Sequence, residues 1–284
     1  MNSRALPIVA ALLSLGSTFA MNMSGMVYLH IPKTGSTFGC ILLQAACGIK
    51  RKCRWETLAP STKVNKDLIN AECPSAFVRF ESGHAPMSDE LYAPGLKRVM
   101  FLRRPWRRSV SGFYNNLHDC SSMRKYVKRG NWSYFYDNIT PAHVQEYATC
   151  INGCAVRMLT GFWCGGDALS VNLTLALQRL RQFAFVGITD AFEHSVRLFG
   201  TLTDTEVSAD AMTTFRKGRQ PAEWVMRQMA AIPFADDLLY INACENLRYQ
   251  TRVVMNASTH MDPRALHASR GFLGDMSICD PRQR

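Results

Sequence analysis

The segment from residue 26 to residue 47 limits most narrowly what this chain can fold into. Residues 26–31 form a short apolar run that predicts a buried strand, and residues 37–47 carry the spacing of a helix. The residues between them include a proline, Lys33 and Gly35, which are typical of a tight loop. A strand, a glycine-bearing loop and a helix in this order predict a phosphate-binding turn in an α/β fold.

Strands and helices alternate along the rest of the chain. Further strands are predicted at residues 76–80, 98–102 and 183–188. Helices are predicted at residues 105–117, 144–162, 173–180, 192–199 and 236–249, and the stretch 121–140 is expected to be a surface excursion. This alternation predicts a P-loop-like three-layer sandwich, in which helices flank a central, mainly parallel sheet. No linker divides residues 21–284, so we expect them to form one domain.

The loop after the first strand carries the chemistry of a phosphate site. Gly35 lets the backbone approach a phosphate closely, and the amides at the start of the helix point at it. Lys33 supplies a compact positive charge, while Ser36 and Thr37 add hydroxyl donors. The loop is not a Walker A motif, because the leading glycine and the Gly-Lys-Ser/Thr order are missing. An ordinary capped turn between strand and helix is the alternative interpretation.

A second group of anion-binding residues lies where the strand at 98–102 meets the next helix. Arg103 ends the strand, and Ser111 lies on the helix, so the two side chains can converge on one phosphate. Four arginines stand near the start of this helix, an arrangement that the helix dipole disfavours unless an anion lies nearby. A solvated basic helix start is the alternative.

The N-terminal residues predict entry into the secretory pathway. Arg4 precedes the apolar run 6–15, and Thr18 and Ala20 are small residues at the positions that a signal peptidase reads. Residues 1–20 are therefore expected to be a signal peptide, with an uncleaved membrane anchor as the alternative. Ten cysteines without a zinc-like spacing, and five Asn-x-Ser/Thr sequons, fit a disulfide-bonded glycoprotein. We expect the Golgi lumen or secretion.

The composition favours a globular protein with an anionic partner. The chain is 47% hydrophobic and 19% charged, which excludes a disordered chain, and its formal net charge is +11. A nucleotide and an acidic polysaccharide both fit this charge, as does a merely solvated basic surface. Residues 50–52 and 124–129 are basic and could line a groove for an acidic acceptor.

Taken together, the motifs resemble those of a known enzyme family. Residues 30–38 resemble the 5′-phosphosulfate loop of sulfotransferases that use 3′-phosphoadenosine-5′-phosphosulfate (PAPS), and residues 101–111 resemble their 3′-phosphate motif. The similarity is to Golgi enzymes that act on glycosaminoglycans, especially the heparan sulfate 6-O- and 2-O-sulfotransferases. Residues 82–85 resemble the segment with the catalytic histidine of that family. Residues 152–159, 185–189 and 237–240 resemble later segments of the same enzymes.

The resemblance implies a role for each motif residue. The 5′-phosphosulfate would be held by Lys33, Thr34, Gly35, Ser36, Thr37 and Phe38. Lys33 would also contact the bridging oxygen, and Arg103 with Ser111 would hold the 3′-phosphate. PAPS would be the donor and 3′-phosphoadenosine-5′-phosphate (PAP) the product, with no metal required because cationic side chains and loop dipoles supply the charge.

His84 would be the general base that takes the proton from a sugar hydroxyl. The alternative is a structural histidine in a Gly-His turn. His30 is the competing histidine and is expected to belong to the end of its strand. Arg157 is a further candidate for holding donor or acceptor.

The expected acceptor is a carbohydrate, an anionic or neutral polysaccharide of the glycosaminoglycan type, and not a nucleic acid. A protein tyrosine or a small-molecule hydroxyl is the rival within the same family. A P-loop-type kinase would need a Mg²⁺ carboxylate and a fuller Walker A loop, and neither is apparent. A lectin-like module without activity would have no need to keep the four residues Lys33, His84, Arg103 and Ser111. Residues 50–75 and 121–140 match nothing in the family, so acceptor specificity stays open.

Overall fold

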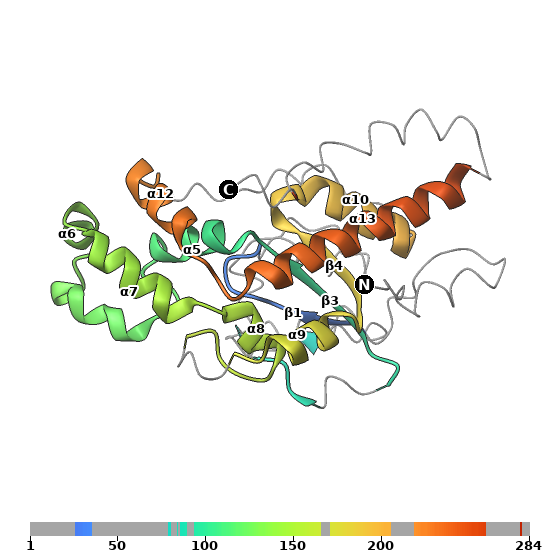
Figure 1. Ribbon diagram of the computed structural model, residues 1–284, viewed down its shortest axis with the longest axis horizontal. Coiled ribbons are helices and arrows are strands. Elements are labelled where there is room, and N and C mark those ends of the chain that lie inside the picture. The colour runs from blue at the N-terminus through green and yellow to red at the C-terminus, as the bar shows by residue number, and fades with distance from the viewer. Residues whose placement is uncertain are drawn as a thin grey trace, which may run out of the picture.

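The computed structural model describes residues 26–35, 79–80, 84, 86–89, 94–165, 171–205, 219–259 and 279. They form an α/β fold around a sheet of parallel strands, which confirms the predicted fold class (Figure 1). The strands are β1 (Met26–Leu29), β2 (Arg79–Phe80), β3 (Lys97–Leu102) and β4 (Phe183–Ile188). Their order across the sheet is β2-β1-β3-β4, and each adjacent pair is parallel. The carboxyl ends of β1 and β3 therefore lie side by side, as the two predicted phosphate motifs require.

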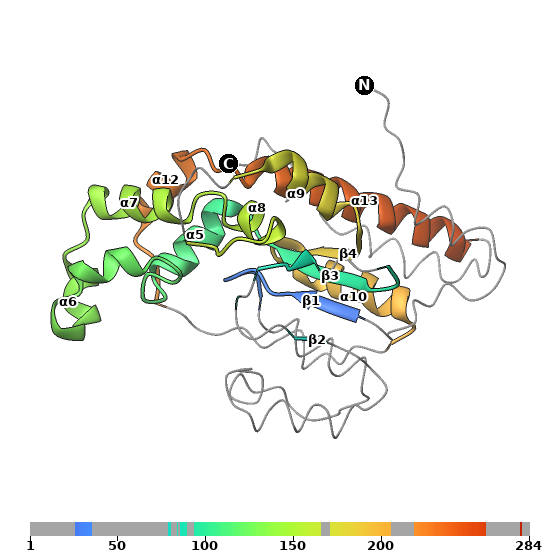
Figure 2. The same cartoon turned by 90° about the horizontal axis from the view of Figure 1, so that it is seen from below.

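The described helices fall into two groups that surround two apolar cores. The α-helices are α5 (Pro105–Phe113), α6 (Trp132–Asp137), α7 (Pro141–Ile151), α8 (Cys154–Leu159), α9 (Leu173–Leu180), α10 (Phe192–Thr203), α12 (Glu223–Ala231) and α13 (Asp237–Thr259). Short 3₁₀ helices are η2 (Ser121–Tyr126), η3 (Lys128–Gly130) and η5 (Thr189–Ala191). One core contains the strands with residues of α8, α9, α10 and α13, and the other contains residues of α5, α6, α7 and α12. Figures 1 and 2 both show this second group as a helical lobe at one end of the sheet.

The strands are apolar because parallel strands are covered on both faces. All four residues of β1 are buried, as are Val99 to Leu102 in β3. Helices α10 and α13 pack against β4, and α13 also contacts α9. This packing fixes the strand ends on which the candidate site is built.

The prediction of one continuous helix over residues 144–162 is wrong. The segment is divided into α7 and α8 at Asn152 and Gly153, because Asn152 is extended and Gly153 has a left-handed φ of 73°. The periodicity continues across the break, so the apolar pattern alone did not reveal it. The stretch 121–140 is likewise more than a surface excursion, because Met123 and Phe135 are buried in the core of the helical lobe.

Three disulfides among the described residues confirm, for the six cysteines that they join, the prediction that cysteines are paired. They join Cys120 to Cys150, Cys154 to Cys164 and Cys244 to Cys279. The predicted signal peptide and the predicted helix at 37–47 lie outside the described residues. Within the described part of the chain, none of the helices combines the length and the apolar character needed to cross a membrane.

Candidate active site

The loop after β1 folds into a tight turn that depends on its glycine. Lys33 has a left-handed φ of 64°, and Gly35 has a φ of 111°. Thr34 is buried, and its hydroxyl donates to the Ile31 carbonyl at 2.7 Å. From the turn after β4, the Thr189 hydroxyl donates to the Thr34 carbonyl. The turn is held from both sides, and a side chain at position 35 would strain it.

The two predicted phosphate motifs meet at Lys33. Arg103 directly follows β3, and its Nη1 donates to the Lys33 carbonyl at 3.4 Å. A Cβ atom at Gly112 would lie 3.7 Å from Cγ of Lys33, so the lysine stem runs past the residue that follows Ser111 on α5. Ser111 is partly exposed and, among the described residues, makes no hydrogen bond to Arg103. The predicted ligands Ser36, Thr37 and Phe38 lie outside the described residues.

The arginines around the start of α5 have different partners. Arg107 pairs with Asp190 at 3.1 Å, and the buried Arg108 pairs with Asp236 at 3.2 Å. Arg103 forms no ion pair with a carboxylate in the part of the chain that the structure describes, and burial lowers the pKa of its guanidinium. Carboxylates of the protein thus account for two of these cations. Arg103 is the one whose environment would improve most on binding an external anion.

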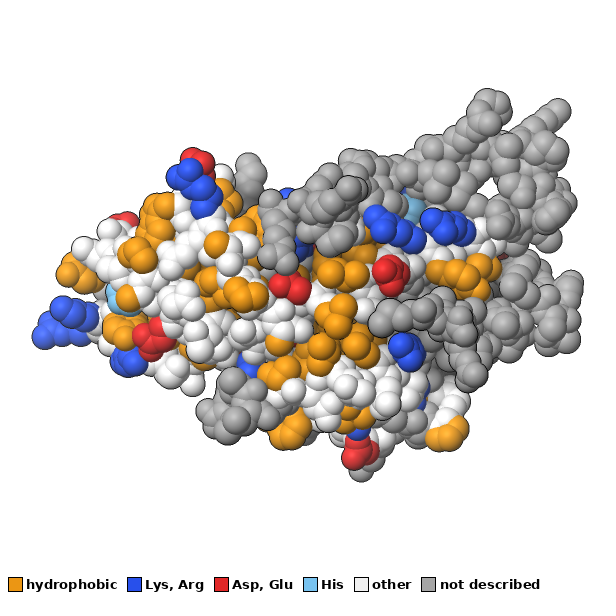
Figure 3. Space-filling model, viewed as in Figure 1, with side chains coloured by type: hydrophobic (Ala, Val, Ile, Leu, Met, Phe, Trp, Pro, Cys, Tyr) orange, Lys and Arg blue, Asp and Glu red, His pale blue; other side chains and the backbone are white. Residues whose placement is uncertain are grey.

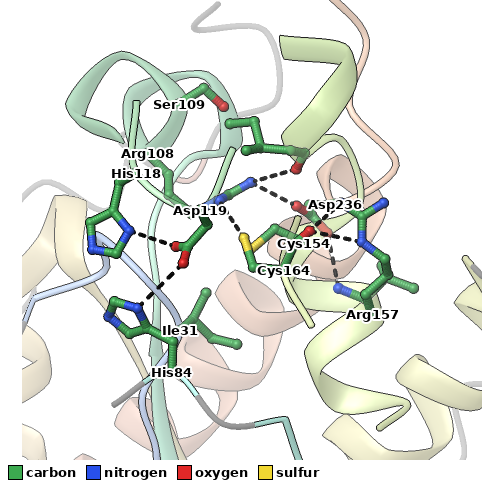
Figure 4. Close-up of a disulfide and its surroundings, with 12 residues drawn as sticks. Ile31, His84, Arg108, Ser109, His118, Asp119, Cys154, Arg157, Cys164 and Asp236 are labelled. Atoms are coloured by element: carbon green, nitrogen blue, oxygen red, sulfur yellow. Dashed lines mark hydrogen bonds and ion pairs between the residues drawn. A yellow bond between two sulfur atoms is a disulfide. The ribbon is translucent and has the colours of Figure 1, made fainter. Parts of the chain in front are cut away.

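His84, the predicted base, lies in a cluster of histidines around Asp119 (Figure 4). Nδ1 of His84 lies 3.6 Å from one oxygen of the Asp119 carboxylate, and Nδ1 of His118 lies 2.8 Å from the other. The closer pair is not aligned as a hydrogen bond, so the buried oxygen lacks an aligned donor among the described residues. The His84 ring centroid lies 4.6 Å from that of His118 and 5.0 Å from that of His30. Asp119 therefore stands at the Nδ1 side of both imidazoles.

Burial and charge give the members of this cluster different protonation states. Burial by itself would raise the pKa of the Asp119 carboxyl, but His118 and His84 lower that pKa well below its usual range. Burial, together with the charges of His84 and His118, lowers the pKa of His30 to about 3. Asp119 is therefore ionised and His30 neutral near pH 7. A histidine with so low a pKa is a weak base, so His84 is the better candidate for proton transfer.

The turn that carries His118 and Asp119 has an unusual backbone. Asn116, Leu117 and Asp119 have left-handed φ values of 57°, 51° and 63°. Asparagine and aspartate tolerate this conformation, but for leucine it is strained. Strain of this kind persists only where the surrounding structure enforces it, and it concentrates at functional sites.

Three contacts enforce this turn. Cys120, directly after it, forms a disulfide with Cys150 of α7. The buried Tyr147, one turn earlier on α7, donates its hydroxyl to the His118 carbonyl at 2.9 Å. The backbone of Gly165 lies so close to the carbonyl of the aspartate that a side chain at this position would overlap it. The turn is thus set by tertiary packing.

His84 is positioned by the segment that follows it. The Met87 backbone N–H donates to the Met158 carbonyl of α8 at 2.9 Å. Asp89 pairs with Arg179 of α9 at 2.6 Å. These contacts fasten the segment to the helices beside the sheet, and they leave the histidine next to the end of β1.

Arg157 does not face a ligand site. It is fully buried, with Nε donating to the Cys164 carbonyl at 2.9 Å and Nη2 donating to the Cys150 carbonyl at 3.1 Å. It joins the segments that carry two of the disulfides. The expectation that Arg157 helps to hold donor or acceptor is therefore replaced by a structural role.

The histidine cluster also has the composition of a metal site. One possible ligand atom from each of His84, His118 and Asp119 lies within 4.8 Å of the others. The expectation that the reaction needs no metal stays a prediction.

Sequence reasoning missed His118 and Asp119. The available signal was an adjacent His-Asp pair a few residues beyond Ser111, directly before a cysteine. Only the left-handed turn after α5 brings that pair back to His84.

The fold and the site together define an α/β protein with a cationic turn at the end of its first strand and a histidine–carboxylate cluster beside it. Residues 18–162, more than half of the chain, match the model of the sulfotransferase family, and the chain belongs to that family. The matched range includes Lys33, His84, Arg103, Ser111 and the His118–Asp119 pair. A search of curated proteins found no match. Membership of the family supports sulfuryl transfer as the activity.

Proposed function

We propose that this protein is a PAPS-dependent sulfotransferase of the secretory pathway, in the Golgi lumen or secreted, that sulfates a hydroxyl of a glycosaminoglycan-like polysaccharide. The observation that carries the proposal is the meeting of Lys33, Arg103 and His84 around the adjacent ends of β1 and β3. His30 directly follows β1, contacts the His84 ring and lies near enough to Lys33 to be affected by its charge.

The two motifs together would hold a nucleotide that carries phosphates at two positions. Lys33, Thr34 and Gly35, with Ser36, Thr37 and Phe38, hold the 5′-phosphosulfate of PAPS. Arg103 and Ser111 hold its 3′-phosphate. Two observations support this assignment. Arg103 has no carboxylate partner among the described residues. The left-handed turn after β1 lets a phosphate approach its backbone. When bound, PAPS supplies the sulfuryl group.

His84 acts as the general base. Asp119 beside Nδ1 favours the tautomer that carries its proton on that nitrogen, which leaves Nε2 to accept the proton of the acceptor hydroxyl. The acceptor oxygen forms a new bond to sulfur as the bond from sulfur to the bridging oxygen breaks. The electron pair of the broken bond stays on the 5′-phosphate, where Lys33 neutralises the charge and PAP leaves.

Two features support a carbohydrate acceptor in an oxidising compartment. Disulfides such as Cys120–Cys150 persist in the secretory pathway and not in the cytosol. The net charge of +11 favours acidic polymers. Among the described residues on the face in Figure 3, the Lys and Arg side chains are scattered and form no continuous stripe.

A transfer assay with labelled PAPS tests the proposal. The acceptors are sulfated and unsulfated glycans, tyrosine peptides and simple alcohols. Wild-type protein is expected to sulfate glycans, and His84→Ala to lose about 10²- to 10⁴-fold in turnover while still binding PAP. Transfer only to peptides or alcohols would show that the acceptor is not a carbohydrate. No transfer to any acceptor and no PAP binding would refute the proposal.

A further inference from the structure

A cavity of about 440 Å³ opens beside the histidine cluster. It lies within the range of about 300–1,000 Å³ that is usual for small-molecule sites. Its wall includes Asn115, Asn116, His118, Ser121, Arg124 and Trp163. The cavity therefore lies between the strained turn after α5, the helix η2 and the segment after α8.

One wall of the cavity is an exposed indole. Trp163 is 62% exposed, more than the other large hydrophobic side chains in the described residues. An apolar ring left in water beside a cavity gains free energy when a ligand covers it. The C–H face of a sugar ring is flat and apolar enough to stack on an indole, whereas its hydroxyl groups point outward.

The remaining wall offers polar groups that lack partners within the described part of the chain. The side chains of Asn115, Asn116 and Ser121 make no hydrogen bond to other described residues, and all three are exposed. Amides and a hydroxyl can both donate and accept, as the hydroxyl groups of a sugar require. This combination suits a ring that carries several hydroxyl groups better than a flat aromatic acceptor.

Arg124 adds a positive charge that no carboxylate of the described residues neutralises. Its neighbour Lys125 pairs with Glu146 at 2.9 Å, but Arg124 pairs with no carboxylate of the described residues. Asp119 also lies in the wall, and its carboxylate lies beside Nδ1 of His84 and Nδ1 of His118. Arginine binds carboxylate and sulfate in a bidentate manner. We therefore expect the ligand of this cavity to carry an anionic group that pairs with Arg124.

The cavity is also within reach of the base. His118 lines it, and the ring of His118 lies 4.6 Å from that of His84. We infer that this cavity is the acceptor subsite and that it takes an anionic sugar residue, stacked on Trp163 with its carboxylate or sulfate bound by Arg124. This inference rests on the proposed function, because it assigns the site where that reaction finds its acceptor.

The test compares Arg124→Gln and Trp163→Ala with wild type and with Arg181→Ala. Arg181 is an exposed arginine at the end of α9, so its removal changes the net charge equally without touching the cavity. Binding of a heparosan hexasaccharide is measured by calorimetry with PAP present, and transfer from PAPS to the same hexasaccharide and to neutral chitohexaose is measured separately. Thermal melting and PAP binding report on folding.

Arg124→Gln is expected to weaken binding of the acidic hexasaccharide about tenfold or more, with a smaller effect on transfer to neutral chitohexaose. Trp163→Ala is expected to weaken binding of the hexasaccharide and transfer to chitohexaose. Arg181→Ala is expected to change neither. If both cavity variants bind and sulfate the acidic hexasaccharide like wild type, the inference is wrong while the proposed function stands. If wild type binds the hexasaccharide through both residues but neither binds PAP nor transfers sulfate to any acceptor, the proposed function fails and a sugar-binding site remains. Failure of wild type to bind the hexasaccharide overturns the inference.

Discussion

Asp119 lies beside two histidines, and one of them, His84, is the base in the proposed mechanism. Its carboxylate lies beside Nδ1 of both His84 and His118, and it is ionised despite partial burial. A carboxylate in this place fixes the orientation and tautomer of a base without touching the substrate. In the proposed mechanism, Asp119 is therefore a positioning residue for His84.

Asp119→Asn is expected to lower kcat by at least about tenfold, because the amide removes the charge that stabilises a protonated imidazole. The KM for PAPS and the affinity for PAP are expected to stay unchanged. Steady-state kinetics and PAP calorimetry measure the two effects. A loss of PAP affinity equal to the loss of kcat would mean that Asp119 acts on the fold and not on the base.

His30 should make stability depend on pH. Its pKa is lowered from 6.5 to about 3 in the folded protein, so the unfolded chain binds its proton first as the pH falls. Stability from this group is present above pH 6.5 and is lost progressively as the pH falls from 6.5 toward 3. His30→Gln cannot take up the proton, so its denaturation midpoint is expected to fall less over this window than that of wild type. Equal losses would contradict the assigned protonation state.

Chelation separates the metal interpretation of the cluster from the acid–base interpretation. Because Lys33 and Arg103 supply the charge in our account, prolonged treatment with EDTA is expected to leave transfer from PAPS unchanged. A loss of activity that Zn²⁺ or Mn²⁺ restores would instead make His84, His118 and Asp119 metal ligands.

At the scale of elements, the site is built by the contact of α5 with α7. Gly112 of α5 faces the hydroxyl of Tyr147, which holds the His118 carbonyl. A side chain at position 112 would overlap this hydroxyl and push the tyrosine away from the turn.

Gly112→Ala is therefore expected to destabilise the protein by about 1–3 kcal/mol and to lower kcat, because overpacking displaces Tyr147. Adding Tyr147→Phe removes the overlapping oxygen and is expected to restore part of the stability, although the bond to His118 is still lost. A double-mutant cycle by chemical denaturation measures this coupling. Additive effects of the two substitutions would show that the overlap between a side chain at position 112 and the Tyr147 hydroxyl does not cause the loss of stability.

The sequence predicted some elements well and others poorly, for identifiable reasons. β1, its loop, β3 and β4 were predictable, because buried parallel strands are apolar and a glycine in a turn has a local meaning. The break between α7 and α8 at Gly153 was missed because the apolar spacing continues through it. The return of Asp119 to His84 could not be foreseen, because it depends on Tyr147, Gly165 and a disulfide that are distant in sequence.

At the scale of the whole molecule, our proposal assigns different halves of the site to the sheet and to the helical lobe. The strand ends carry Lys33 and Arg103, which suit the donor, and the turn after α5 carries His118 and the cavity that suits the acceptor. His84 lies between them. Such a division allows the lobe to set acceptor specificity while the sheet keeps donor binding.

The most direct test of this account is the transfer of labelled sulfate from PAPS by wild type and by Lys33→Asn in one assay with a glycan acceptor. Asparagine tolerates the left-handed backbone at position 33, so the substitution removes the ammonium group and leaves the turn intact. The account predicts transfer by wild type and a fall of about 10²- to 10³-fold in Lys33→Asn with unchanged thermal stability. Transfer by Lys33→Asn at the wild-type rate would contradict it.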